Sequence, residues 1–144
     1  MRTTYVLNGP NLNLLGHRDP DVYGTATLAD VEQLCHDEGD RLGLQVMCRQ
    51  SNHEGTLIDW IHEAFEQEAA VVGNFGAYTH TSIAIMDALA VVRAPVVEVH
   101  ISDIYAREEF RHTSYVGLVA DAHVVGRGIR GYVEALGKVV ELWT

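Results

Sequence analysis

Short apolar runs alternate with amphipathic segments along the whole chain, and this alternation constrains the fold more than any other feature. Runs rich in β-branched residues and bounded by polar ones are typical of buried strands in a parallel sheet. Five such runs are present: Tyr5–Leu7, Leu44–Cys48, Ala70–Gly73, Val96–Val99 and Ala122–Val125. Their order predicts an α/β fold with a doubly wound, five-stranded parallel sheet and right-handed crossovers.

Between the runs, apolar residues recur at the spacing of an amphipathic helix. The pattern is clear over Leu28–Leu42, Leu57–Phe65 and Ile129–Trp143. Thr27 and Asp30 have the spacing of a capping box, which predicts that the first of these helices begins just after Thr27. With 144 residues and no linker or internal repeat, the chain is predicted to form a single domain over residues 1–144.

Charge and composition exclude several classes of partner and mechanism. A formal net charge of −10 without a cluster of Lys and Arg argues against nucleic acid and anionic membranes. No signal peptide or membrane-length apolar run is evident, and Cys35 and Cys48 form no CxxC pair, so we expect a cytoplasmic protein with reduced thiols. Lys138 is the only lysine and lies near the C-terminal end, which disfavours chemistry through a lysine imine.

The connection after the first strand is unusually long. From Asn8 to Ala26 it takes about nineteen residues, where such loops normally take two to six. The polar segments 50–54, 74–82 and 100–112 follow the next three strands. Because ligands of such sheets bind beyond the carboxyl ends of the strands, these four segments predict a binding site at that edge.

Glu98 and His100 are the clearest catalytic candidates. A period of two places both on the same face of the fourth strand. A carboxylate beside an imidazole fixes the ring and favours its protonated form, which is what a general acid needs. The alternative interpretation is a structural ion pair.

Tyr23 in the long loop lies close in sequence to Arg18, and a guanidinium next to a phenol favours the phenolate, so this pair could supply a general base. Tyrosines in loops more often serve packing, which is the alternative.

Arg107 and Arg111 are four residues apart and would share one face of a helical turn, where they could clamp a carboxylate. The alternative for these arginines is a solvated run of charges with the glutamates between them.

Two other patterns are not expected to carry a function. GRGIRG at residues 126–131 matches a dinucleotide-binding fingerprint, but too few residues follow it to form the second strand that such a site requires, so we interpret it as a glycine-rich turn. The eight histidines are scattered, with no close pair at metal-ligand spacing, and we expect no metal site.

The loops also resemble a known family. VLNGPNLNLLGHRDPDVYG, QSNHEG, NFGAYTHTSIAIMDAL and VEVHISDIYAREEFRH are similar, in order and in register, to the four signature blocks of type II dehydroquinases (type II 3-dehydroquinate dehydratases). The resemblance implies a flavodoxin-like fold, a homododecamer built as a tetramer of trimers, and a hydro-lyase that works without a cofactor. The implied reaction is the reversible trans (anti) elimination of water from 3-dehydroquinate to 3-dehydroshikimate, in the shikimate pathway or in quinate catabolism.

The resemblance also assigns catalytic roles. Tyr23 matches the base that removes the proton next to the ketone. Arg18 matches the residue that favours its phenolate, with Arg107 implied to assist. Asn11 matches the residue holding a water that polarises the enolate oxygen. His100 matches the acid that protonates the departing hydroxyl, with Glu98 in support.

Further positions match the family's substrate-binding residues. Asp87 is implied to reach the site of a neighbouring subunit, and Ile101 and Ser102 are implied to act through their backbone N–H groups. The full set of matching binding positions is Asn74, His80, Asp87, Ile101, Ser102 and Arg111, with Arg107 and Gly76 in supporting roles.

This sequence departs from the family pattern at a few places. Phe75 replaces a usual proline, which predicts an altered turn next to Asn74, and Asp103 stands where asparagine is common. The added charge of Asp103 predicts weaker or altered binding of an anionic substrate; Tyr105 and Thr113 replace histidines. Two alternatives stay open: an enzyme of the same fold acting on a related cyclic hydroxy-keto acid, and a non-catalytic flavodoxin-like binding or receiver module.

Overall fold

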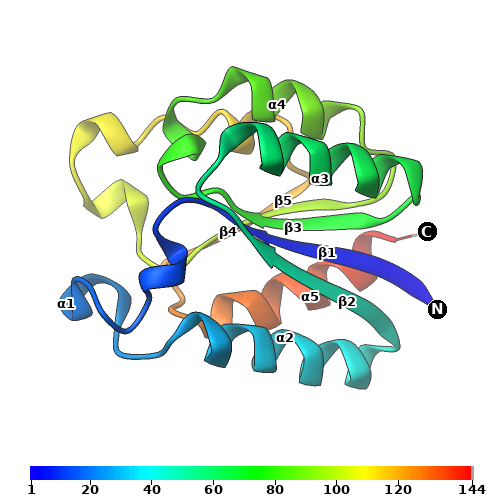
Figure 1. The fold of residues 1–144 in the computed structure, drawn as a ribbon, viewed down its shortest axis with the longest axis horizontal. Coiled ribbons are helices and arrows are strands. Elements are labelled where there is room, and N and C mark those ends of the chain that lie inside the picture. Colours follow the sequence, from blue (N-terminus) through cyan, green and yellow to red (C-terminus); the bar gives the residue numbers. More distant parts are fainter. Residues whose placement is uncertain (144) are drawn as a thin grey trace.

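A parallel sheet forms the centre of the molecule, seen in a computed structural model that describes residues 1–143 (Figure 1). Its strand order is β2-β1-β3-β4-β5, and every neighbouring pair runs parallel. The strands are β1 (Arg2–Asn8), β2 (Leu44–Gln50), β3 (Ala70–Asn74), β4 (Val96–His100) and β5 (Ala122–Val125). The predicted five-stranded α/β sheet is therefore confirmed, and all five strands end at the same edge.

Two helices cover each face of the sheet (Figure 1). The helices α2 (Leu28–Leu42) and α5 (Arg130–Leu142) lie on one face, and α3 (Glu54–Glu66) and α4 (Ile83–Ala90) lie on the other. The predicted capping box is present, since the Asp30 backbone N–H donates to Thr27 Oγ1 and the Thr27 backbone N–H donates to Asp30 Oδ2. Gly43, in the left-handed conformation, ends α2.

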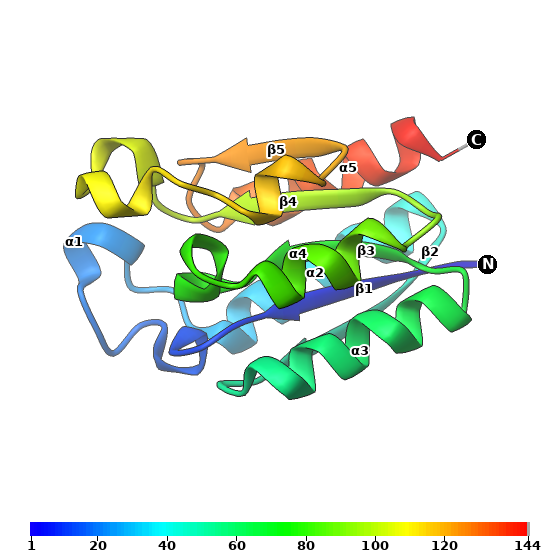
Figure 2. The same cartoon turned by 90° about the horizontal axis from the view of Figure 1, so that it is seen from above.

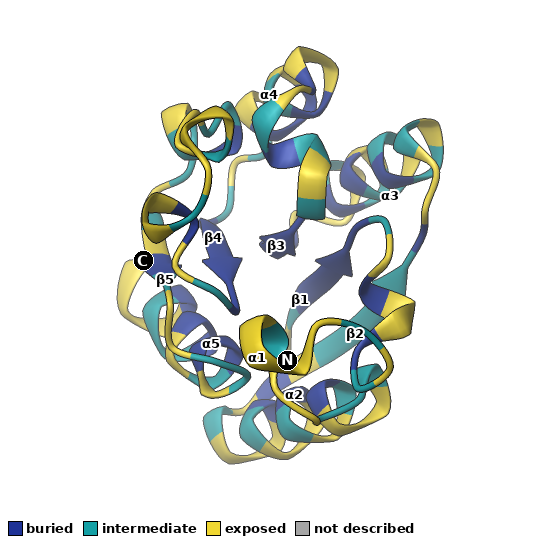
Figure 3. Cartoon of the chain, turned by 90° about the vertical axis from the view of Figure 1, so that its left-hand side faces the viewer, coloured by how far each residue is buried: buried dark blue, intermediate teal, exposed yellow. Residues whose placement is uncertain are grey.

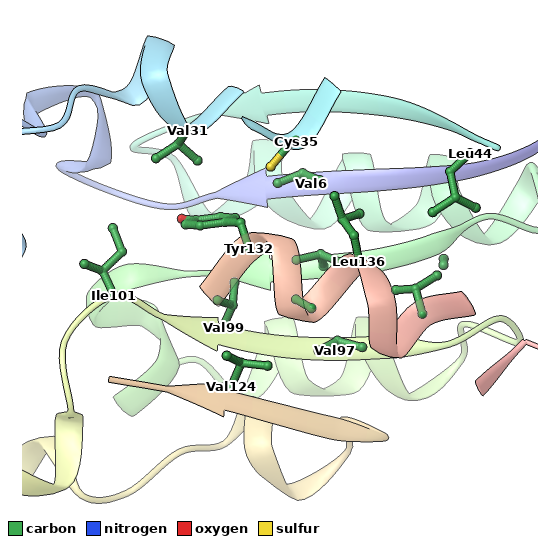
Figure 4. Close-up of a cluster of buried hydrophobic side chains, with 14 of the residues drawn as sticks. Val6, Val31, Cys35, Leu44, Val97, Val99, Ile101, Val124, Tyr132 and Leu136 are labelled. Carbon is green, nitrogen blue, oxygen red and sulfur yellow. The ribbon is translucent and has the colours of Figure 1, made fainter. Parts of the chain in front are cut away.

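Alternation along the strands produces two apolar cores. In β1, Val6 faces the core beneath α2 and α5, whereas Tyr5 and Leu7 face the core beneath α3 and α4. Figure 4 shows the first core, with Val97 and Leu136 buried between the sheet and α5. Both faces of the sheet are thus packed, which holds the strand ends firmly in place.

The carboxyl edge carries the irregular structure. Figure 2 shows the loops after β1 and β4 next to each other beyond the strand ends, and Figure 3 views the same end directly. The long first loop contains a 3₁₀ turn, Leu12–Leu14, and the short helix α1 (Pro20–Tyr23). The other 3₁₀ turns are Gly76–His80 after β3, followed by Ile104–Ala106, Glu109–Arg111 and Val116–Leu118 between β4 and β5.

The glycine-rich segment after β5 is a tight turn, as predicted. Gly126 and Gly128 adopt φ angles of 75° and 62°, which favour glycine. Their backbone N–H groups donate to the carbonyl oxygens of His100 and Ile101, at 3.1 and 3.0 Å. The turn therefore fixes the backbone where β4 ends. Within residues 1–143, no helix is both long and apolar enough to cross a membrane.

Candidate active site

A cavity of about 140 Å³ opens at the carboxyl edge of the sheet. The loops after β1, β3 and β4 surround it, and Figure 3 looks toward this end of the molecule. Except for Glu98 and Asp87, every site residue predicted from the sequence lines it: Asn11, Arg18, Tyr23, Asn74, Gly76, His80, His100, Ile101, Ser102, Arg107 and Arg111. Pro10, Leu12, Leu15, Ala77 and Ile104 also line it, and sequence reasoning had not singled them out.

Tyr23, the last residue of α1, lies between two arginines. Arg107 Nη1 donates a hydrogen bond to the Tyr23 hydroxyl at 3.0 Å. The Arg18 guanidinium lies instead over the ring, 5.0 Å from its centroid, and contacts Asp19 at 3.3 Å. Both arginines therefore lie beside the phenol, as the resemblance implies, but they contact different parts of it. Arg107 donates to the phenol oxygen, and Arg18 lies over the ring.

His100 and Glu98 form a buried pair on β4, as their spacing predicts. His100 Nε2 lies 2.8 Å from Glu98 Oε2, and the Glu98 side chain is only 1% exposed. Two further groups donate to the same carboxylate: the Ser114 hydroxyl, and His123 Nδ1 at 2.8 Å. Burial by itself raises the pKa of Glu98, but the hydrogen bonds from His100, Ser114 and His123 outweigh burial and lower it to about 2. The carboxylate is therefore charged at neutral pH.

Sequence reasoning had missed the contributions of Ser114 and His123. His123 pairs with Glu98 in the register between β4 and β5. Ser114 comes from the loop before β5, and its hydroxyl also accepts from the Gly117 backbone N–H at 2.8 Å. The only sequence signal for His123 is its place in a strand adjacent to Glu98, which requires the strand order to be known.

Asn74 ends β3 and reaches the cavity from below. Its Oδ1 accepts from the Gly76 backbone N–H at 3.3 Å, and its Nδ2 donates to the Tyr132 hydroxyl at 3.0 Å. Gly76 has a φ of 58°, and an added Cβ there would lie 3.0 Å from the Pro10 carbonyl oxygen. Asn11 also adopts a left-handed conformation, with a φ of 68°, and its backbone N–H donates to Asn52 Oδ1 at 3.0 Å.

His80 and Arg111 complete the wall formed by the later loops. His80 Nδ1 lies 2.7 Å from the Thr113 carbonyl oxygen and so carries a hydrogen there. Burial lowers the pKa of His80 and favours the neutral ring. Arg111 Nε donates to Glu108 Oε2 at 2.8 Å. Both arginines line the cavity, but their side-chain partners differ: Arg107 donates to Tyr23, and Arg111 donates to Glu108.

Asp87 lies apart from the cavity of its own chain. It sits on α4 with its side chain exposed. Its carboxylate is therefore accessible from outside the molecule. Among residues 1–143, no group of three or more His, Cys, Asp or Glu side chains is placed to hold a metal ion.

Two departures from the family pattern lie beside the cavity without lining it. Phe75 is buried, and its ring lies so close to Gly73 that an added Cβ there would approach a ring carbon to 2.2 Å. Gly73 thus makes room for the larger residue. Asp103 Oδ1 accepts from the Tyr105 backbone N–H at 3.0 Å, which begins the turn Ile104–Ala106.

Known proteins are similar to this chain in both sequence and structure. The family described as Dehydroquinase class II matches residues 2–140. The 3-dehydroquinate dehydratase of Variovorax paradoxus (strain S110) is 56% identical over 97% of this chain and 99% of its own. The enzyme of that name from Rhodopseudomonas palustris (strain TIE-1) is 60% identical over 91% of this chain and 87% of its own.

Two solved structures extend the likeness to three dimensions. The type II dehydroquinase from Propionibacterium acnes superimposes with a TM-score of 0.94 and 44% identity, covering 98% of this chain and 97% of that one. A 3-dehydroquinate dehydratase-like protein from Bifidobacterium longum superimposes with a TM-score of 0.76 and 32% identity, covering 99% and 98%. The flavodoxin-like architecture expected from the sequence is thus shared with solved relatives.

Proposed function

This chain belongs to the class II dehydroquinase family, and we propose that it removes water from 3-dehydroquinate to give 3-dehydroshikimate. Such a reaction needs a base for the proton next to the ketone, stabilisation of the enolate oxygen, and an acid for the departing hydroxyl. The observation that carries the proposal is one cavity lined by Tyr23, bonded to Arg107, and by His100, bonded to Glu98.

The base in this proposal is the Tyr23 phenolate. The hydrogen bond from Arg107 and the guanidinium of Arg18 over the ring both stabilise negative charge on the phenol. The phenolate takes the proton on the carbon next to the ketone, and the electron pair moves onto the ketone oxygen. A water held by Asn11 then stabilises the enolate oxygen by hydrogen bonding.

The acid in this proposal is the His100 imidazolium. The buried Glu98 carboxylate, charged at neutral pH, holds Nε2 and stabilises the protonated ring. The enolate then re-forms the ketone, a new carbon–carbon double bond forms next to it, and the bond from carbon to the hydroxyl breaks. The other ring nitrogen, Nδ1, gives its proton to that hydroxyl, which leaves as water. Each turnover ends with Tyr23 protonated and His100 neutral, and proton exchange with solvent restores both groups. The two groups act on opposite faces in a trans (anti) elimination.

The remaining lining groups are proposed to bind the substrate. Arg111 and the backbone N–H groups of Ile101 and Ser102 offer donors for the carboxylate and ring hydroxyls. Asn74 and His80 offer further polar contacts, and Gly76 lets the backbone pass close to the cavity. No step in this scheme calls on a cofactor.

Assembly and location remain part of the proposal. We propose the homododecamer implied by the family resemblance, a tetramer of trimers, in which the exposed Asp87 reaches a neighbouring site. A cytoplasmic location stays a prediction. Sedimentation of the purified protein would check the assembly, because a monomer of 15.9 kDa and a twelvefold complex differ greatly in size.

The proposed activity is tested by mixing the purified chain with 3-dehydroquinate and following ultraviolet absorbance. The product carries a carbon–carbon double bond conjugated to its ketone, and the substrate does not. We expect absorbance to rise at a rate proportional to enzyme concentration. A folded protein that gives no rise would contradict the proposal and favour the related hydroxy-keto acid or the non-catalytic module as its function.

A further inference from the structure

A fully buried tyrosine from the last helix lies directly beneath the cavity. Tyr132 on α5 is 0% exposed, and Figure 4 shows its hydroxyl pointing out of the apolar cluster toward the end of the sheet near Ile101. The hydroxyl contacts both Asn8 and Asn74, the last residues of β1 and β3, which are paired across the sheet. Tyr132 therefore joins two strand ends at the floor of the cavity, although it does not line it.

The direction of each hydrogen bond follows from the chemistry of the groups. The Gly76 backbone N–H can only donate, so the Asn74 atom that faces it at 3.3 Å must be Oδ1. Nδ2 then faces Tyr132 and donates to its hydroxyl oxygen at 3.0 Å. The single hydrogen of that hydroxyl goes to Asn8 Oδ1 at 2.6 Å. The two hydrogen bonds therefore run in one direction, from Asn74 through Tyr132 to Asn8, and form a hydrogen-bond chain.

This hydrogen-bond chain fixes which polar groups Asn74 presents to the cavity. Asn74 is 4% exposed and Asn8 is 1% exposed, so neither amide can replace a lost partner easily with water. With Oδ1 and one N–H of Nδ2 engaged, Asn74 keeps one N–H and one lone pair for whatever enters the cavity. Burial raises the pKa of Tyr132, so its hydroxyl keeps its hydrogen and its direction at neutral pH.

We propose that Tyr132 is a positioning residue for the active site, whose hydroxyl sets the orientation of the Asn74 amide and hence the polar groups offered to the substrate. The proposal rests on the proposed function, because it requires Asn74 to contact 3-dehydroquinate. It differs from a role in packing alone, for which the aromatic ring suffices and the hydroxyl is not needed.

Tyr132→Phe tests the proposal because it removes the hydroxyl and keeps the ring. We expect kcat/KM for 3-dehydroquinate to fall about 3- to 10-fold, the equivalent of one hydrogen bond, with KM rising. Tyr5→Phe is the matched control: Tyr5 is equally buried, but it lies in the opposite core and donates to Glu63. We expect this control to lose stability without losing activity.

A double-mutant cycle with Asn74→Ala separates positioning from packing. Asn74→Ala should lower kcat/KM about 10- to 100-fold, and adding Tyr132→Phe should then have no further effect, because no amide remains to orient. Should Tyr132→Phe fail to fold, Asn8→Leu interrupts the same chain at its acceptor. It leaves the Tyr132 hydroxyl without its acceptor, so the hydroxyl no longer holds the Asn74 amide in a fixed position. The same 3- to 10-fold loss is expected, again absent beside Asn74→Ala.

Three outcomes would overturn the inference. A folded Tyr132→Phe with kcat/KM within twofold of the wild type would show that the hydroxyl does not matter for the reaction. Equal losses with and without Asn74 would show that Tyr132 acts by another route. A folded wild-type chain that does not turn over 3-dehydroquinate would overturn the proposed function and this inference together, whereas the first two outcomes leave the proposed function intact.

Discussion

The two sides of the cavity are held by very different parts of the fold. The acid side stands on β4, where His100 and Glu98 are buried and the carboxylate has donors from His100, Ser114 and His123. The base side stands on the long loop after β1, where Tyr23 ends a helix of four residues and touches the rest of the site through arginine side chains. The proposed acid is thus built into the sheet, and the proposed base is brought to it by a loop.

This difference indicates how each side fails when it is altered. Groups in a packed sheet are positioned before the substrate arrives, which lowers the cost of organising the site during the reaction. The proposed base on the long loop is held by fewer polar contacts: the hydrogen bond from Arg107, beside packing of the Tyr23 ring against the first core. Variants of the acid side should therefore alter stability as well as activity, whereas variants of the base side should alter activity alone.

The largest effect is expected from Tyr23→Phe. The change removes the oxygen proposed to act as the base and leaves the ring in place. We expect kcat to fall about 10²- to 10⁴-fold, the usual contribution of a general base, with an unchanged melting temperature. Steady-state assays and thermal melts check both parts, and turnover within tenfold of the wild type would remove Tyr23 from the mechanism.

On the acid side, Glu98→Gln should change the dependence of stability on pH. Burial raises the pKa of Glu98, yet its hydrogen bonds lower it overall to about 2, against an ordinary 4.5, so the folded state favours the carboxylate. This stabilisation is present above about pH 5 and is lost as the pH falls from about 4.5 to 2. It amounts to about 3 kcal/mol.

The measurement is the free energy of unfolding against pH for wild type and variant. Between pH 5 and pH 2 the wild type should lose about 3 kcal/mol more than Glu98→Gln. Glu66→Gln, at an exposed position on α3, is the control and should follow the wild type. Parallel curves for Glu98→Gln and the wild type would show that the buried network does not favour the charged carboxylate.

A smaller effect should separate the two arginines around Tyr23. Arg107→Met removes the hydrogen bond to the phenol oxygen, so kcat/KM should fall about tenfold. Arg18→Met removes only a cation over the ring, and about a threefold loss is expected. Rates measured from pH 6 to 10 check this order, and a larger loss in Arg18→Met would reverse our assignment.

Much of the fold could be predicted because its signals are local. All five strands, the capping box at Thr27 and the turn at the C-terminal glycines follow from residues near one another in the chain. The helix α4 was not delineated from periodicity, since Ile83–Ala90 is short and apolar almost all round. The 3₁₀ turns after β4 could not be predicted either, because a single turn has too few residues to form a periodic pattern.

Reasoning from the residues alone predicts a contact in the site only where neighbours in sequence are also neighbours in space; the other site residues were predicted from the family resemblance. Glu98 and His100 share a strand, so period two reveals the pair. Arg107 is 84 residues from Tyr23 in the chain, and His123 contacts Glu98 from the neighbouring strand, β5. Neither contact therefore has a local signal in the sequence. Tyr132 fits the apolar stripe of its helix and its hydroxyl role depends on where β1 and β3 end, which only the folded chain shows.

The central claim is that two separate groups act on the substrate, Tyr23 on the proton and His100 on the hydroxyl. His100→Ala tests it directly when 3-dehydroquinate is incubated with the variant in heavy water. NMR then follows deuterium entering next to the ketone, together with loss of the hydroxyl. We predict that elimination falls about 10²-fold or more while deuterium exchange continues, and that Tyr23→Phe loses both. Exchange and elimination lost to the same extent in His100→Ala would contradict the division of roles.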